Sequence, residues 1–214
     1  MNGDPWLSQL QLQRAIAVIR APTPDLGIAM AQAVAVGGMR WIEIAWNTDR
    51  APAVIAQLRS ELPHCQVGAG TVLTLDQLQT AISAGSQFCF TPHVNPALIA
   101  LARKHDLPII PGAFSPTEIV TAWQAGATCV KIFPVLALGG ATYIHSLQGP
   151  LGHIPMIPTG GVTLENARVL IEAGAIAIGL STSLFPQQAL QAANWQEITR
   201  RATRLLQILN AKDC

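Results

Sequence analysis

Residues 108–134, "PIIPGAFSPTEIVTAWQAGATCVKIFP", contain the pattern on which the fold prediction rests. Two short apolar runs, 108–113 and 129–134, flank a segment at 115–126 whose apolar residues recur with helical spacing. That middle segment begins with Ser and Pro and ends with Gly, as helix capping prefers. A strand, a helix and a second strand in this order indicate a βαβ unit, whose two strands are parallel.

The same alternation of short apolar and helical segments runs along the chain. The predicted strands are residues 15–20, 40–46, 65–70, 87–92, 108–113, 129–134, 156–161 and 175–181. We also expect a helix before the first strand, at 4–13, and an amphipathic closing helix at 194–212. Eight βα units predict an α/β fold, and more narrowly a single (β/α)8 TIM barrel domain over residues 1–214 with an extra N-terminal helix.

An open, doubly wound sheet is the alternative fold for repeated βα units. Sheets of that kind that bind dinucleotides carry Gly-x-Gly-x-x-Gly after the first strand, and no such motif follows residues 15–20. The barrel is therefore the favoured prediction.

Composition limits the classes of partner. The 214 residues are 50% hydrophobic, and 13 basic against 12 acidic residues give a net charge of +1, without a basic block. Nothing here indicates nucleic-acid binding, and no apolar run approaches the roughly 18 residues of a membrane span. The first residues also lack a signal-peptide pattern. We expect a cytoplasmic protein whose partner is a small uncharged or anionic metabolite.

The four cysteines, Cys65, Cys89, Cys129 and Cys214, are widely spaced, without a Cys-x-x-Cys pair. We interpret them as small buried hydrophobic residues rather than as disulfides or a zinc site.

Lys131 is one of only three lysines, and it lies inside the apolar run at 129–134. By strand alternation, Val130 and Ile132 face the helices, while Cys129, Lys131 and Phe133 face the barrel interior. Burial can lower the pKa of a lysine by several units, which favours the neutral amine. The alternative is a lysine whose stem is buried and whose ammonium reaches water or a structural ion pair.

Glu43 is the only acidic residue in the eight predicted strands. Trp41, Glu43 and Ala45 share a face by alternation, so Glu43 points into the same interior as Lys131 if the isoleucines on its other face pack against helices.

Three further polar residues, Arg20, Thr71 and Thr159, lie at or near the carboxyl ends of different strands, where catalytic groups of barrels are found. Taken singly, the threonines are typical turn residues and Arg20 a typical surface charge. Their shared placement with Lys131 and Glu43 favours a site.

Two glycine-rich stretches, "TGGV" at 159–162 and "GLSTS" at 179–183, follow the seventh and eighth strands. Phosphate groups commonly bind at these two positions of a barrel, although such glycines also serve tight turns.

Seven motifs carry a resemblance to a known family. In order, they are "IEIAWNT", "VGAGTVL", "TPHVNP", "IIPGAFSPTE", "VKIFP", "PTGGV" and "IGLSTSLFP", between Ile16 and Pro186. The chain resembles the class I 2-keto-3-deoxy-6-phosphogluconate (KDPG) and 4-hydroxy-2-oxoglutarate (KHG) aldolases. The resemblance implies a (β/α)8 barrel, a homotrimer, a place in the Entner–Doudoroff pathway, and no metal or other cofactor.

The resemblance also implies roles for individual residues. Lys131 would form the Schiff base, Glu43 would be the general acid and base, and Thr71 would bind the pyruvate carboxylate. Pro92 and Phe133 would line the pocket, with Thr159 beside the carbonyl and hydroxyl end of the substrate. The residues expected to hold a substrate phosphate are Gly160, Gly161, Gly179 and Ser181.

Asn47 departs from the family pattern, because many members have a carboxylate-binding Arg there. We expect Arg20 to take its place.

Other functions remain open at this point. Within the family, KHG or the galactonate epimer of KDPG could be the substrate. A metal-dependent aldolase or decarboxylase would need the histidines, of which only His93 is expected near the site, and their spacing matches no ligand motif. A phosphate-ligand-binding barrel without chemistry is the third possibility, but it gives no reason to keep two inward charges.

Overall fold

The structure is a computed structural model that describes residues 5–211. Cys214 and the outermost residues of the two predicted terminal helices, Asp4 and Lys212, lie outside the described residues. The helices are α1 Pro5–Gln13, α2 Pro24–Val36, α3 Ala51–Glu61, α4 Leu75–Ser83, α5 Pro96–Lys104, α6 Pro116–Gln124, α7 Ala141–Leu151, α8 Ala167–Glu172, α9 Gln187–Gln191 and α10 Trp195–Asn210, with a 3₁₀ turn at Val135–Leu138.

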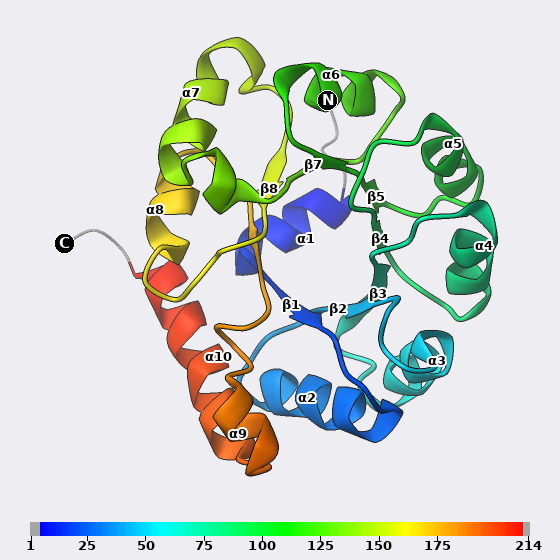
Figure 1. Cartoon of the computed structure of the whole chain (residues 1–214), viewed down its shortest axis with the longest axis vertical. Coiled ribbons are helices and arrows are strands. Elements are labelled where there is room, and N and C mark those ends of the chain that lie inside the picture. Colours follow the sequence, from blue (N-terminus) through cyan, green and yellow to red (C-terminus); the bar gives the residue numbers. More distant parts are fainter. Residues whose placement is uncertain (1–4, 212–214) are drawn as a thin grey trace.

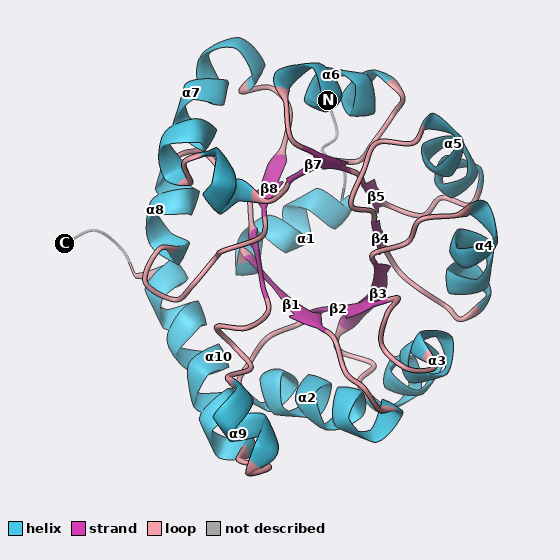
Figure 2. Ribbon diagram, in the orientation of Figure 1, coloured by secondary structure: helices cyan, strands magenta, loops and turns pink. Residues whose placement is uncertain are grey.

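The strands form two parallel sheets, in the orders β5-β4-β3-β2-β1-β9 and β6-β7-β8. Their bounds are β1 Ala15–Ile19, β2 Trp41–Ala45, β3 Gln66–Gly70, β4 Cys89–Phe90, β5 Ile109–Ile110, β6 Gly112–Ala113, β7 Val130–Ile132, β8 Met156–Pro158 and β9 Ile178–Leu180. Figures 1 and 2 show the strands curling around a common centre, with helices α2 to α10 outside them. An isolated parallel bridge, Thr159 to Gly179, connects the ends of β8 and β9.

Pro111 divides one predicted strand. The segment 108–113 forms two short strands, β5 paired with β4 and β6 paired with β7. Proline has no backbone N–H for a strand ladder, although the Pro111 carbonyl accepts a bond from the Lys131 amide at 2.9 Å. The prediction of one strand here was therefore wrong, while each of the other seven predicted segments contains one strand.

Helix α6 shows why the helices begin where they do. Ser115 and Glu118 form a capping box, in which each side chain accepts a bond from the backbone of the other residue, and Pro116 occupies the first turn. The chain thus enters the helix directly after β6, and the capped turn lies at the carboxyl ends of the strands.

The core has two parts. The larger cluster lies between the sheets and the helices and contains Ile42, Ile44, Val130 and Ile132. The smaller cluster lies inside the curled sheets and contains Trp41, Phe88, Phe90 and Cys129, together with Leu10 of α1. The two faces of β2 and β7 therefore belong to different cores, as strand alternation predicts.

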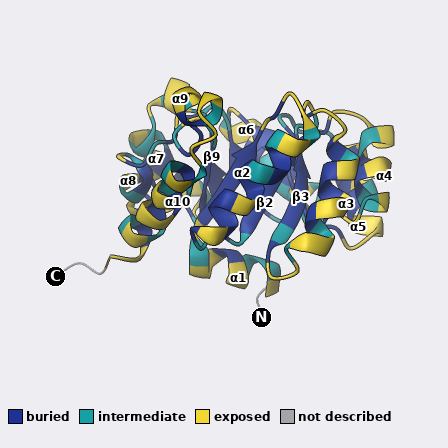
Figure 3. Ribbon diagram, turned by 90° about the horizontal axis from the view of Figure 1, so that it is seen from below, coloured by how far each residue is buried: buried dark blue, intermediate teal, exposed yellow. Residues whose placement is uncertain are grey.

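Helix α1 lies across one end of the curled sheets (Figures 1 and 3). The Trp6 ring packs edge-on against Trp41 at a centroid distance of 5.1 Å, and Trp41 lies 5.8 Å from Phe88. These aromatic rings fill the interior at the amino ends of the strands, so the space for a ligand lies at the opposite, carboxyl ends.

Two further predictions concern the burial of the cysteines and the length of apolar segments. Cys65, Cys89 and Cys129 are buried and form no disulfide within residues 5–211, which confirms the prediction for these three cysteines. None of the helices described in residues 5–211 combines the length and apolarity that crossing a bilayer requires.

Candidate active site

Lys131 occupies the middle of β7 and points away from the helices. Its neighbours Val130 and Ile132 belong to the larger core cluster, between the sheets and the helices. Lys131 itself is 4% exposed and lines a cavity inside the curled sheets. Its Nζ lies 4.5 Å from the centre of the Phe133 ring and 6.0 Å from that of Phe90. The amine is thus held among aromatic faces rather than carried to the surface on a flexible stem.

Burial is the main cause that lowers the pKa of Lys131. The nearby negative charge of Glu43 opposes the shift, and the positive charge of Arg20 adds to it. An ammonium loses most of its hydration in such a place, so the neutral amine becomes easier to form. A neutral amine is the form that attacks a carbonyl carbon.

Glu43, in β2, is buried in the same interior, at 1% exposure. Both carboxylate oxygens are buried, and neither accepts a hydrogen bond within residues 5–211. Burial raises the pKa of Glu43, while the charges of Lys131 and Arg20 act in the opposite direction. The carboxyl group therefore holds its proton at a higher pH than an exposed glutamate does.

Gly70, at the end of β3, makes room for this carboxyl group. It pairs in register with Ala45, and a methyl group at its Cα would overlap the Glu43 carboxylate. The second glycine of the "GAGT" motif is thus explained by the space that the Glu43 carboxylate occupies.

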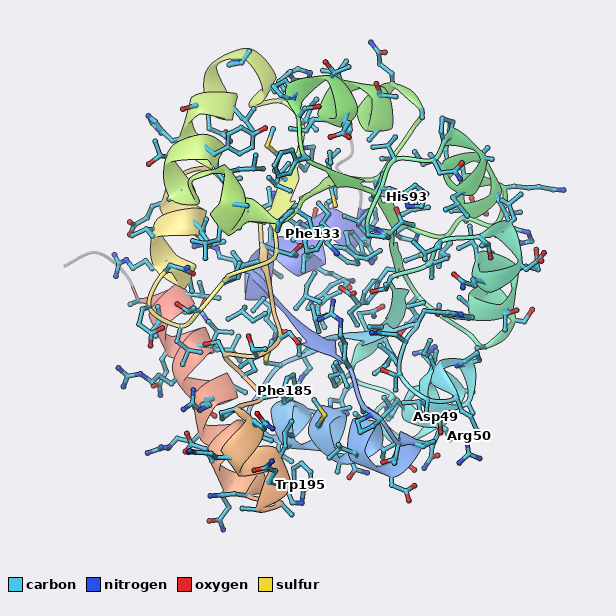
Figure 4. The ribbon with its side chains drawn as sticks, viewed as in Figure 1. Asp49, Arg50, His93, Phe133, Phe185 and Trp195 are labelled. Atoms are coloured by element: carbon cyan, nitrogen blue, oxygen red, sulfur yellow. The ribbon has the colours of Figure 1, made fainter. Side chains whose placement is uncertain are left out.

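A cavity of about 170 Å³ opens beside Lys131 at the carboxyl ends of β1, β7, β8 and β9. Eight of the predicted site residues line it: Arg20, Lys131, Phe133, Thr159, Gly160, Gly161, Gly179 and Ser181. Figure 4 shows Phe133 on the inner side of the strands, close to β8. The structure thus brings together residues from both ends of the sequence.

The two glycine-rich stretches make tight turns and also line the cavity. Gly160 and Gly161 have φ of +83° and +86°, a region that side chains rarely adopt. A Cβ on Gly179 would lie 2.6 Å from the Thr159 methyl carbon. These glycines therefore make tight turns and at the same time line the cavity.

Arg20 follows β1 at the mouth of the cavity, and its Nη1 donates a 3.4 Å hydrogen bond to the Ser181 hydroxyl. Pairing of β1 with β9 brings these residues together across 161 positions of sequence. Arg50, the arginine nearest in sequence to Asn47, is 72% exposed beside Asp49 at the outer edge, near α3 (Figure 4). Arg20, unlike Arg50, is placed to reach a ligand in the cavity.

Glu43, Thr71 and Pro92 are not among the residues that line this cavity. Glu43 is close enough to Lys131 for each charge to alter the pKa of the other residue. Thr71 directly follows β3 with φ of +59°. The Pro92 backbone packs against Gly112, the register partner of Lys131. Glu43 belongs to β2, and Thr71 and Pro92 follow β3 and β4, whereas the cavity lies at the ends of β1 and of β7 to β9.

Sequence reasoning missed three residues that line the cavity: Val18, Val162 and Thr182. Val18 was predictable, because it shares a strand face with Arg20. Val162 and Thr182 adjoin predicted residues in the two glycine-rich loops, but loop residues have no fixed alternation from which their direction could be read.

The histidines are not gathered at this site. His93 lies on the side of β4 and β5 (Figure 4), where its carbonyl accepts a bond from the Thr91 hydroxyl. Within residues 5–211, no group of three or more His, Cys, Asp or Glu residues is arranged to hold a metal ion.

Comparisons with known proteins agree with the motifs. A family model described as "KDPG and KHG aldolase" matches residues 7–201. The 2-dehydro-3-deoxy-phosphogluconate aldolase of Treponema pallidum is 36% identical over 94% of this chain and 95% of its own length. The KHG/KDPG aldolase of Escherichia coli K12 is 31% identical over 87% and 88% of the two chains.

Solved structures show the same relationship. One described as native KDPGal has a TM-score of 0.83 and 31% identity, over 91% of this chain and 93% of its own. The KDPG aldolase of Legionella pneumophila, with pyruvate captured as a covalent carbinolamine, has a TM-score of 0.84 and 26% identity, over 93% and 97% of the two chains.

Proposed function

The chain belongs to the KDPG and KHG aldolase family, and from this we propose that it is a class I aldolase that splits KDPG into pyruvate and glyceraldehyde 3-phosphate. The same chemistry applies to KHG, which gives pyruvate and glyoxylate. The observation that carries the proposal is the buried Lys131 amine, with a lowered pKa, at the wall of a cavity.

Lys131 supplies the covalent step. Its neutral Nζ attacks the C2 carbonyl carbon of the substrate, and the carbonyl oxygen takes a proton, which gives a carbinolamine. The carbinolamine hydroxyl takes up a proton and leaves as water, which forms an iminium ion. Removal of the C4 hydroxyl proton then breaks the C3–C4 bond, and its electron pair moves into the iminium ion to leave an enamine and an aldehyde. Protonation of C3 and addition of water release pyruvate and restore the amine.

Glu43 is the proposed proton carrier for these steps. Because its pKa is raised, this carboxyl group can still carry a proton at a pH where an exposed glutamate has lost it, and it can act as acid and base in turn. Since Glu43 does not line the cavity, we propose that a water molecule relays the proton to the substrate.

The glycine-rich loops support a phosphorylated substrate. Gly160, Gly161, Gly179 and Ser181 line one part of the cavity, where backbone N–H groups and a hydroxyl are available to phosphate oxygens. We propose that Arg20 and Thr71 orient the carboxylate, that Pro92 and Phe133 border the pyruvate portion, and that Thr159 lies beside the reacting carbons.

The bond from Arg20 to Ser181 brings the guanidinium close to the proposed phosphate end as well.

Trapping with pyruvate and borohydride tests the proposal. Reduction of the imine should add one three-carbon unit, and peptide mapping should place it on Lys131. The Lys131→Ala variant should show no adduct, whereas Lys104→Ala, at an exposed position at the end of α5, should be labelled like the wild type. An adduct that persists in Lys131→Ala would refute the assignment.

The galactonate epimer is the second candidate substrate, favoured by the 31% identity to the KDPGal structure. The ratios of kcat/KM for KDPG, its epimer and KHG, measured on one preparation, decide which is preferred. Ligand binding without turnover of any of them would favour the non-catalytic alternative.

We also propose the finer features of the fold and assembly. The Thr159 to Gly179 bridge and the continuous segment 109–113 support one closed (β/α)8 barrel with α1 as its extra N-terminal helix and residues 1–214 as one domain. Family membership supports a cytoplasmic homotrimer in the Entner–Doudoroff pathway. Light scattering should give a mass about three times 22.7 kDa; a monomer would contradict the trimer.

A further inference from the structure

The loop between β9 and α9, residues 181–186, carries Ser181 and Thr182 into the cavity wall. It turns back on itself, because the amides of Leu184 and Phe185 both donate to the Ser181 carbonyl, at 2.9 and 3.1 Å. Leu184 is fully buried and Phe185 is 5% exposed, and both belong to the larger core cluster. The far end of the loop is therefore anchored by apolar packing.

Ser183 connects this loop to two other elements. Its hydroxyl accepts a 3.2 Å bond from the Leu164 amide, in the loop that follows β8 and contains Gly160 and Gly161. Its carbonyl accepts a 3.0 Å bond from Nη1 of Arg201, in α10. Both glycine-rich loops and the closing helix thus meet at one residue next to the cavity.

The peptide unit between Ser183 and Leu184 is held at both of its polar groups. Arg201 donates to its carbonyl, and its N–H donates to the Ser181 carbonyl. Because a peptide unit is planar, fixing both groups fixes the turn that begins at Ser181. A charged donor makes the bond to Ser183 stronger than a neutral one would.

Arg201 is itself held in place. Its Nε donates a 2.7 Å bond to Oε1 of Glu197, one helical turn earlier, and the Glu197 amide is capped by Asn194 at 3.1 Å. Bonds from Arg201 and Arg200 keep the pKa of Glu197 below its ordinary value. The carboxylate therefore stays ionised and keeps the Arg201 guanidinium directed at the loop.

We propose that Arg201, held by Glu197, is a positioning residue for the phosphate end of the cavity. Arg201 does not line the cavity and acts through Ser183 on the turn that presents Ser181 and Thr182. The inference rests on the proposed function, because it takes the glycine-rich loops to be the phosphate site. It concerns binding of the phosphate group and not formation of the Schiff base at Lys131.

The test compares a phosphorylated with an unphosphorylated ligand in the Arg201→Ala variant. The KM for KDPG should rise roughly tenfold, which corresponds to about 1.4 kcal/mol. The pyruvate concentration that gives half-maximal borohydride trapping should stay within about twofold of the wild type, because pyruvate has no phosphate. In Arg201→Lys the KM for KDPG should rise less than in Arg201→Ala, since an ammonium can still donate to the Ser183 carbonyl.

Arg200→Ala is the matched control. Arg200 also bonds to Glu197, but its side chain is 77% exposed. The KM of Arg200→Ala for KDPG should equal that of the wild type. Glu197→Gln should raise the KM for KDPG as Arg201→Ala does, but by a smaller factor.

Four results separate the possibilities. Equal increases in the KM for KDPG and the pyruvate half-saturation would show a merely structural role and overturn the inference, as would an Arg201→Ala variant that behaves like Arg200→Ala. If Arg201→Ala does not fold, the KM values of Arg201→Lys and Glu197→Gln decide, and wild-type values in both overturn the inference. Wild-type protein that traps no pyruvate would instead refute the proposed function.

Discussion

Lys131 and Glu43 come from different sheets, yet both are buried in the interior, and the charge of each shifts the pKa of the other. Burial, the larger cause for both, lowers the pKa of the amine and raises that of the carboxyl group. The interior thus favours a neutral nucleophile beside a neutral acid, a pair that promotes imine formation and the later proton transfers.

Removal of the Glu43 proton carrier should slow turnover. Glu43→Gln keeps the shape of the side chain but cannot exchange a proton, so kcat for KDPG should fall by about 10² to 10⁴. Steady-state assays measure this fall, and borohydride trapping with pyruvate should still label Lys131. A kcat within threefold of the wild type would rule out Glu43 as the main acid and base.

Glu43 should also make stability depend on pH. Because its folded pKa is raised above 4.5, its stabilising contribution is complete below pH 4.5 and is lost as pH rises through the folded value. The glutamine in Glu43→Gln does not titrate. The free energy of unfolding of this variant should therefore increase relative to that of the wild type as pH rises above 4.5. Urea unfolding at several pH values measures the difference; a constant difference would contradict the raised pKa.

Lys131 should set the pH dependence of imine trapping. Burial lowers its pKa below 10.5, so the fraction of neutral amine saturates at a lower pH than that of an exposed lysine. The initial rate of pyruvate trapping, plotted against pH, should level off below pH 10.5. A rate that rises through 10.5, as for a free amine, would show that the buried environment has no effect.

Gly70→Ala should disturb the site through Glu43. The added methyl group would overlap the carboxylate, so we expect a loss of about 1–3 kcal/mol in stability together with a lower kcat. Gly27→Ala, in α2, is the control, because its nearest contact would be an ordinary 3.4 Å and alanine favours a helix. Denaturant unfolding and kcat of both variants test this; equal effects would remove the special role of Gly70.

The capping box of α6 should respond to acid in the opposite sense to Glu43. Bonds from the Phe114 and Ser115 amides lower the pKa of Glu118, so its contribution is present above pH 4.5 and is lost as pH falls through the folded value. Ser115→Ala should cost about 1 kcal/mol at neutral pH. Thermal unfolding of Ser115→Ala and Glu118→Gln at neutral and acid pH measures both effects; an acid-independent cost of Glu118→Gln would contradict the lowered pKa.

Much of the fold could be read from the chain, because strand alternation and helix caps are local properties. The opposite faces of β7 followed from the period of a strand, and the two cores bear this out for Val130, Ile132 and Cys129. Pro111 shows the limit of such reasoning. Its missing N–H was visible in the sequence, but the transfer of the chain from one sheet to the other depends on which strands lie beside it.

The site, like the fold, has features that local sequence predicts and features that depend on tertiary contacts. By itself, the sequence determined that Lys131 and Glu43 point inward and that glycine-rich turns follow the seventh and eighth predicted strands, because residue type and strand period are enough for that. Only the tertiary structure decided that Arg20 meets Ser181, that Thr71 and Pro92 do not line the cavity, and that Arg201 holds the Ser183 carbonyl. These contacts join residues that no local period relates, and they exist only once the strands have paired and α10 has packed beside them.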